Sequence, residues 1–190
     1  MRAVKQGELD ALCGIYALIN ALEPTGMTGP RTTMHKQLFR RLTLGLPADR
    51  LQAAMFDGLD SEDLLETGSK AFRWLGRRHR IKVRLERPWH DTDFTGVDAY
   101  LERLRHAVSR PQAAVIVNVH MPGYSHWSVV RRFEGRRALL RDSGTLRLLE
   151  LDRFSLDRGR YRFSAIDTLL LTRSPKSTAL RLGPDLRQQL

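Results

Sequence analysis

The stretch Gln6-Gly-Glu-Leu-Asp-Ala-Leu-Cys13-Gly-Ile-Tyr-Ala-Leu-Ile-Asn-Ala-Leu22 contains the only cysteine of this 190-residue chain. After Cys13 the apolar residues recur at helical spacing, with alanines between them, at Ile15, Leu18, Ile19 and Leu22. This pattern predicts a helix that is buried on most of its faces. Cys13 and Gly14 would begin the helix, and the polar Gly7-Glu8 segment would leave the thiol exposed to solvent at the start of the helix.

A cysteine in this position has a chemical advantage. The first turn of a helix offers unpaired N–H groups and the positive end of the helix dipole, and both favour the thiolate. The thiolate is the nucleophilic form of cysteine. We therefore predict that Cys13 is a nucleophile, against the alternative that a lone cysteine is a small buried hydrophobic residue.

The C-terminal half of the chain offers a base for this nucleophile. Residues 113–120 predict a buried strand, residues 121–125 form a loop with a Pro-Gly turn, and His126 opens the next strand. The chain reverses near Gly135 and returns to Asp142 as a hairpin. His126 and Asp142 would then lie approximately opposite each other, where Cβ atoms are roughly 4.5–5.5 Å apart. A carboxylate at that distance can hold an imidazole in one tautomer.

These residues together resemble the papain-like cysteine peptidase superfamily, and in particular small bacterial members such as bacteriocin-leader peptidases. The resemblance covers the segments 6–22 and 115–144, and the middle of the chain carries no matching motif. The pairs His126-Trp127 and Asp142-Ser143 also resemble ubiquitin-like-protein proteases. In those enzymes, however, the cysteine follows the histidine and the aspartate, so the order in this chain favours the papain arrangement.

The resemblance implies a role for each matching residue. Cys13 would be the nucleophile, His126 the general base and acid, and Asp142 the residue that orients the imidazole. Gln6 and the Cys13 backbone N–H would form the oxyanion hole, although family members usually place this glutamine one residue nearer the cysteine. The loop at 121–125 would line the pocket beside His126, as it does in relatives.

Further residues around the expected cleft are predicted to contact substrate. These are Gly14, Tyr124 and Trp127, and Trp127 alternatively fills the core or covers the His126–Asp142 pair. His120 is the alternative base, although a histidine at the end of a strand is commonly a structural residue. The other four histidines have no partner at metal-ligand spacing, and no HExxH or paired CxxC motif is present, so we expect no metal and no cofactor.

The chain is strongly basic, with 32 lysines and arginines against 21 aspartates and glutamates and a net charge of +11. Arginine supplies 27 of the 32 basic residues, a bias that often reflects genome composition. The arginines fall in short clusters on separate predicted elements. No RNP, zinc or helix-turn-helix motif accompanies them, so the charge alone does not predict a nucleic-acid partner. Steering of an acidic substrate is compatible with this charge.

The remaining periodicities predict an α+β domain at 1–173 and a polar tail at 174–190. As the resemblance implies, it would be papain-like: an N-terminal helical lobe carries the Cys13 helix and packs on a C-terminal antiparallel sheet, with the active site in the cleft between them. After a loop at 23–30, we expect helices at 33–44, 51–56, 61–78 and 97–108, with Ser61 as an N-cap. Strands are expected at 81–86, 115–117, 126–130, 138–142, 146–151 and 165–171.

We therefore predict a cysteine peptidase that hydrolyses peptide or isopeptide bonds in a peptide or protein substrate. The alternatives are an acyltransferase or glutamine deamidase with the same triad, and a catalytically silent binding module. No apolar run approaches the roughly 20 residues of a membrane helix, and no signal peptide is evident. We therefore expect a bacterial cytoplasmic protein without a membrane partner, with export without a cleaved leader as the alternative. Substrate specificity and oligomeric state are not readable from the sequence.

Overall fold

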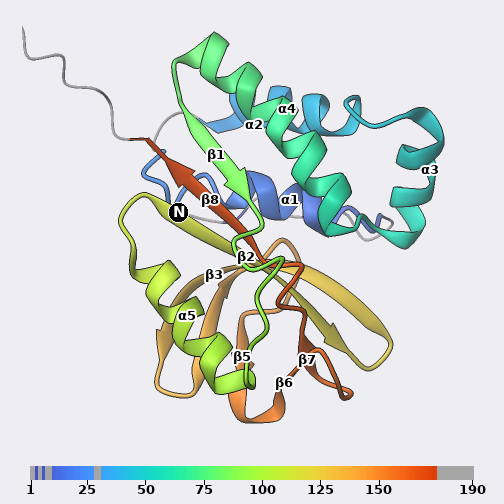
Figure 1. Cartoon of the computed structure of the whole chain (residues 1–190). Coiled ribbons are helices and arrows are strands. Elements are labelled where there is room, and N and C mark those ends of the chain that lie inside the picture. The colour runs from blue at the N-terminus through green and yellow to red at the C-terminus, as the bar shows by residue number, and fades with distance from the viewer. Residues whose placement is uncertain (1–2, 4–5, 7–9, 28–30, 175–190) are drawn as a thin grey trace, which may run out of the picture.

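The computed structural model describes residue 3, residue 6, residues 10–27 and residues 31–174 (Figure 1). Its helices are α1 (Cys13–Asn20), α2 (Arg31–Thr43), α3 (Ala48–Asp57), α4 (Ser61–His79), α5 (Val97–Ser109) and the 3-10 helix η1 (Leu151–Arg153). Its strands are β1 (Val83–Glu86), β2 (Ala113–Met121), β3 (Tyr124–Glu134), β4 (Arg137–Arg141), β5 (Leu148–Glu150), β6 (Ser155–Leu156), β7 (Arg162–Phe163) and β8 (Leu169–Arg173).

All eight described strands belong to one sheet, whose main path runs β1-β8-β2-β3-β4-β5. Every pair along this path is antiparallel, and only the short β6–β7 pair beside β2 is parallel. Strand β1, which follows the helical segment, pairs with β8 at the end of the described chain. The predicted α+β class is therefore confirmed.

The sheet has a hydrophobic core on each face, because successive residues of a strand point to opposite sides. Ala114 and Ile116 of β2 pack with the helical lobe α1–α4, whereas Val115 and Val117 pack with α5 on the other face. Figure 1 shows α5 on the side of the sheet away from α2 and α4. The prediction of a single helical lobe on the sheet was therefore incomplete.

Helix α1 lies between the sheet and α4, and glycines make this close packing possible. A Cβ atom on Gly14 would lie 2.7 Å and 2.8 Å from the two terminal carbons of Leu64. A Cβ atom on Gly68 would lie 2.7 Å from Leu85 Cδ2 and 3.3 Å from Leu18 Cδ1. Helix α4 runs unbroken through Gly68. The absence of a side chain at this position leaves room for Leu18 and Leu85.

Several predicted boundaries need correction. The N-cap of α4 is Asp60 and not Ser61, because the Asp60 carboxylate accepts the Asp63 N–H at 2.8 Å. The loop expected at 121–125 is only the two-residue turn Pro122-Gly123, since β2 and β3 pair from Met121 and Tyr124 inward. Other elements begin or end elsewhere: α2 begins at residue 31, α3 spans 48–57, β1 begins at 83, β5 spans 148–150 and β8 begins at 169.

Strands β6 and β7 were not predicted, since each has only two residues. The loop predicted at 23–30 is described as far as Met27, where the chain forms turns. The predicted tail lies outside the described residues except for Ser174. Among the described residues, no helix combines the length and the apolar character needed to span a bilayer.

Candidate active site

Cys13 is the first residue of α1, and its surroundings fix this end of the helix. Just before it, the Asp10 carboxylate accepts the Leu12 N–H at 3.0 Å, and the Ala11 N–H donates to the Met55 carbonyl of α3 at 2.9 Å. Only 7% of the surface of Cys13 is exposed. The expectation of an exposed thiol was therefore wrong, because Cys13 is buried where the segment before it is anchored to α3.

His126 and Asp142 meet on the hairpin of β3 and β4. The Nε2 atom of His126 and the Oδ2 atom of Asp142 are 2.6 Å apart. Val129 pairs with Arg141, and continuing this register places Ser128 opposite Asp142. His126 and Asp142 are therefore diagonal neighbours on one face, two positions from directly opposite, which confirms the prediction that they lie approximately opposite each other.

A β-bulge puts these two side chains on the same face. Next to the turn the register pairs Arg132 with Leu139, whereas beyond Arg131 it pairs Val130 with Leu140. Arg131 is thus an extra residue in β3. A shift of one residue exchanges the faces of a strand. Without the bulge, Asp142 would lie opposite Val129 and would share a face with Trp127 instead of His126.

The His126 imidazole is charged at neutral pH. Burial is the largest single influence and by itself lowers the pKa of His126. Hydrogen bonds with Asp142 and with Cys13, together with the negative charge of both groups, outweigh burial and raise the pKa from its ordinary value of 6.5 to about 9. Because Asp142 occupies Nε2, the nitrogen available to the sulfur is Nδ1.

The Asp142 carboxylate is fully buried yet ionised. Burial, the largest influence, would raise its pKa, but contacts with His126, the Ser128 hydroxyl and the Gly144 N–H lower it below its ordinary value of 3.8. The Gly144 N–H donates to Oδ1 at 2.7 Å. One oxygen of Asp142 is thus fixed by the chain that follows β4, and the other holds the imidazole.

The N-terminal segment reaches this site through Gln6. The Gln6 backbone N–H donates to the Ser143 carbonyl at 3.0 Å, next to Asp142. The Gln6 side-chain amide donates to the Asp10 carbonyl, and the Ser143 hydroxyl donates to the Gln6 side-chain oxygen at 3.4 Å. Gln6 therefore joins the segment before Cys13 to the segment after Asp142, and its role in an oxyanion hole stays a prediction.

The three residues predicted to contact substrate have different positions. Tyr124 is 54% exposed, and its ring centroid lies 6.3 Å from that of His126, the proposed base. Trp127 is buried, and its indole N–H donates to the Leu59 carbonyl at 2.9 Å. Gly14 packs against Leu64. Trp127 is therefore a core residue, which was the alternative to substrate contact, and the substrate roles of Gly14 and Tyr124 stay predictions.

His120, the alternative base, lies on β2 and points to the opposite face of the sheet from His126. It pairs with Ser125, one position away from the Val119–His126 pair, so its side chain and that of His126 point to opposite faces. Burial, reinforced by the charge of Arg162, lowers the pKa of His120. Within the described ranges, no three His, Cys, Asp or Glu side chains gather as metal ligands would.

Sequence analysis missed two groups of the site. Ser128 is two residues beyond His126 on β3, and alternation along the strand could have identified it as a neighbour of the carboxylate. The Leu59 carbonyl comes from the loop between α3 and α4. Its contact with Trp127 joins residues 68 positions apart, and no local pattern predicts such a contact.

No known protein-family model matches this chain, and no curated protein matches it at a significant level. The papain-like resemblance therefore rests on the residues themselves. A papain-like identity is accordingly a proposal, supported by the positions of Cys13, His126 and Asp142.

Proposed function

We propose that this protein is a cysteine peptidase with a papain-like fold that hydrolyses peptide or isopeptide bonds. The observation that carries the proposal is the convergence of Cys13, His126 and Asp142. They come from α1 and from the β3–β4 hairpin, and the hydrogen bonds around the imidazole link all three. A triad of this kind is recognised by geometry and by the role of each member.

Proton transfer from the Cys13 sulfur to His126 Nδ1 precedes the reaction and gives a resting thiolate–imidazolium pair, in keeping with the raised pKa of His126. The sulfur attacks the carbonyl carbon of the scissile bond and forms a tetrahedral intermediate. When this collapses, the C–N bond breaks, the amine leaves with the proton from His126, and a thioester remains on Cys13. Water then attacks the thioester while His126 takes a proton from it, and the acid product leaves as the thiolate–imidazolium pair re-forms.

Asp142 has a positioning role in this cycle. Its bond to Nε2 orients Nδ1 toward the sulfur, and its buried charge stabilises the imidazolium of the resting pair and of the step in which water attacks. Backbone N–H groups at the start of α1 have no acceptor within the helix, and with the Gln6 side chain they would stabilise the oxyanion. Removing one such donor typically costs about 2.7–4 kcal/mol of transition-state stabilisation.

The sharpest test uses the single cysteine. The rate of iodoacetamide alkylation at pH 6 is measured by mass spectrometry for the native protein, for His126→Ala and for the matched control His120→Ala. We expect about tenfold slower alkylation in His126→Ala and a native rate in His120→Ala, because only the imidazolium beside the sulfur favours the thiolate at this pH. Equal rates in all three proteins would favour a silent binding module.

A second measurement separates hydrolysis from the other reactions of the same triad. Products from a peptide library are identified by mass after incubation with native protein and with Cys13→Ala. Peptidase activity cleaves the chain with addition of water, deamidation converts a glutamine to a glutamate, and acyl transfer joins the acyl group to an amine. Only cleavage that Cys13→Ala abolishes supports the proposal.

A further inference from the structure

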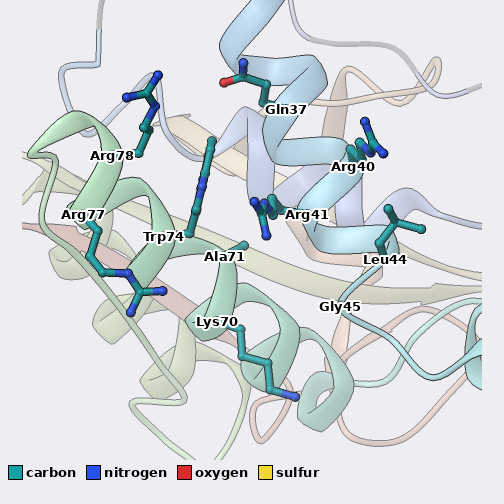
Figure 2. A pocket seen from close by; sticks show the side chains of 10 residues that line it. All are labelled: Gln37, Arg40, Arg41, Leu44, Gly45, Lys70, Ala71, Trp74, Arg77 and Arg78. Atoms are coloured by element: carbon teal, nitrogen blue, oxygen red, sulfur yellow. The ribbon is translucent and has the colours of Figure 1, made fainter.

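A cavity of about 740 Å³ lies between α2 and α4, on the helical lobe (Figure 2). Its wall contains five cationic side chains and one indole: Arg40, Arg41, Lys70, Trp74, Arg77 and Arg78. None of the residues proposed for catalysis lines it. The cavity is therefore a feature separate from the triad.

Helical spacing explains why these charges meet. Arg40 and Arg41 are adjacent positions on α2, while Lys70, Trp74 and Arg77 follow at intervals of four and three on α4 and so share one face. The two helices pack against each other with these faces bordering the cavity. Figure 2 shows the indole of Trp74 rising from α4 toward α2, where Arg41 lies beside it.

The cavity has an excess of positive charge. Lys70 pairs with Glu66 at 2.6 Å. In the part of the chain that the structure describes, no carboxylate lies within ion-pair distance of the four arginines. Positive groups that line a concave surface raise the local potential and attract anions. Guanidinium groups also bind phosphate oxygens through paired hydrogen bonds.

We propose that this cavity binds a small organic polyphosphate of the nucleoside triphosphate class. The phosphate groups would contact the arginines, and the flat ring would pack on Trp74. The Arg41 guanidinium lies over the indole, 5.4 Å from its ring centroid, and the His79 ring packs in a T-shaped arrangement at 5.4 Å, so the ligand's ring would contact the part of the half-buried indole that these two leave open. The volume lies within the range of about 300–1,000 Å³ typical of small-molecule sites.

Charge density favours a polyphosphate over an acidic peptide. The segment of α4 from Lys70 to Arg78, which carries the cations on that side of the cavity, is about 12 Å long at 1.5 Å per helical residue. An extended peptide of that length has about four residues, and alternate side chains point away from the cavity, so about two carboxylates would face it. A triphosphate carries at least one negative charge on each of three neighbouring groups. It therefore matches four unpaired guanidiniums better.

The test is isothermal titration of the full chain with adenosine triphosphate and with inorganic triphosphate, both without Mg²⁺ and at 0.15 M salt. The double variant Arg40→Gln/Arg77→Gln removes two cavity charges. The control Arg103→Gln/Arg110→Gln removes two exposed charges on α5 and at its C-terminal end. We expect the cavity variant to weaken binding of both ligands by about tenfold or more, since it removes two charge-assisted hydrogen-bond donors from the phosphates, and the control to change it by less than twofold.

Trp74→Leu tests the ring contact separately. It should weaken adenosine triphosphate several-fold and leave inorganic triphosphate unchanged. Cys13→Ala should bind as the native protein does, so the result stands apart from the proposed peptidase activity.

Three results would overturn the proposal. One is no binding of either ligand at millimolar concentration, and another is an equal loss of affinity in the cavity variant and the α5 control. The third is tighter binding of a glutamate decapeptide or an oligothymidylate than of adenosine triphosphate, with the same loss in Arg40→Gln/Arg77→Gln. That result would make the cavity part of a surface for a macromolecule.

Discussion

The Nε2 atom of His126 lies 2.6 Å from the Oδ2 atom of the buried Asp142. This contact fixes the imidazole by one nitrogen and leaves Nδ1 for the sulfur of Cys13. It also brings a permanent negative charge to a ring that is itself largely buried. Both the chemistry of the site and part of the pH dependence of the fold follow from it.

Asp142→Asn should lower the pKa of His126 from about 9. The variant preserves the shape of the side chain but removes its negative charge. The effect of burial, which lowers the pKa of His126, is then less fully compensated. Histidine proton chemical shifts followed against pH would measure the change, with His126→Gln to assign the signal. If peptidase activity is found, the same substitution should reduce kcat by at least about 10²-fold, since it also disturbs the tautomer. A pKa that stays near 9 would contradict the assigned role.

The stability of the protein should fall between about pH 6.5 and pH 9 because of His126. The raised pKa means that the folded state keeps this proton above pH 6.5, where the unfolded state has lost it, so folding is favoured below pH 6.5 and the advantage disappears through pH 9. The part of the shift that comes from Cys13 is offset where the unfolded thiol keeps its own proton, so the loss of stability is smaller than the pKa shift alone implies. Urea denaturation across this range should show a steeper loss for the native protein than for His126→Gln.

Acid should destabilise the fold through Asp142. Its pKa lies below 3.8 in the folded state, so its stabilising contribution is present above pH 3.8 and is lost as the pH falls through the folded value. Native protein should therefore lose more stability than Asp142→Asn between pH 5 and pH 2. Parallel curves for the two proteins would contradict this expectation.

Gly14→Ala should destabilise the fold by about 1–3 kcal/mol, because the new methyl group would collide with the fully buried Leu64. Chemical denaturation measures the loss. The double variant Gly14→Ala/Leu64→Ala should lose less than the two single variants together, since the smaller residue at 64 makes room for the methyl group. Additive losses would show that Gly14 is required for another reason.

Asp60→Ala should cost about 1 kcal/mol, as expected for the loss of an N-cap. Asp60→Asn retains the acceptor for the Asp63 N–H and should be nearly neutral. It also removes the charge that lies 3.8 Å from Arg50, so the pair of variants separates the cap from the ion pair. Thermal denaturation of the three proteins gives the comparison.

Local patterns identified much of this molecule. The apolar period after Cys13 predicted the helix that begins there, and the strand–turn–strand pattern around Gly135 predicted the hairpin, whose two-residue turn is Gly135-Arg136. The same pattern placed His126 and Asp142 approximately opposite each other, without deciding on which face of the sheet each side chain lies. These predictions depend on residues close in sequence, so periodicity and turn chemistry were sufficient.

The roles of two residues near Cys13 could not be predicted in this way. Gly14 is required by Leu64 of α4, and the Trp127 indole is bound by the Leu59 carbonyl. Each contact joins elements that are distant in sequence. Likewise, the sequence alone shows the arginines of α2 and α4 only as short charged clusters on separate helices. The packing of the two helices places them around one cavity.

The sequence by itself determined the residue types of the proposed triad, the helix and hairpin that carry them, and the α+β class. The tertiary structure alone decided the phase of β3, in which Arg131 is an extra residue and turns His126 to the face of Asp142. The physical reason is that side chains alternate with a period of two along a strand. A single bulged residue, without any distinctive sequence, therefore decides which side chains can meet.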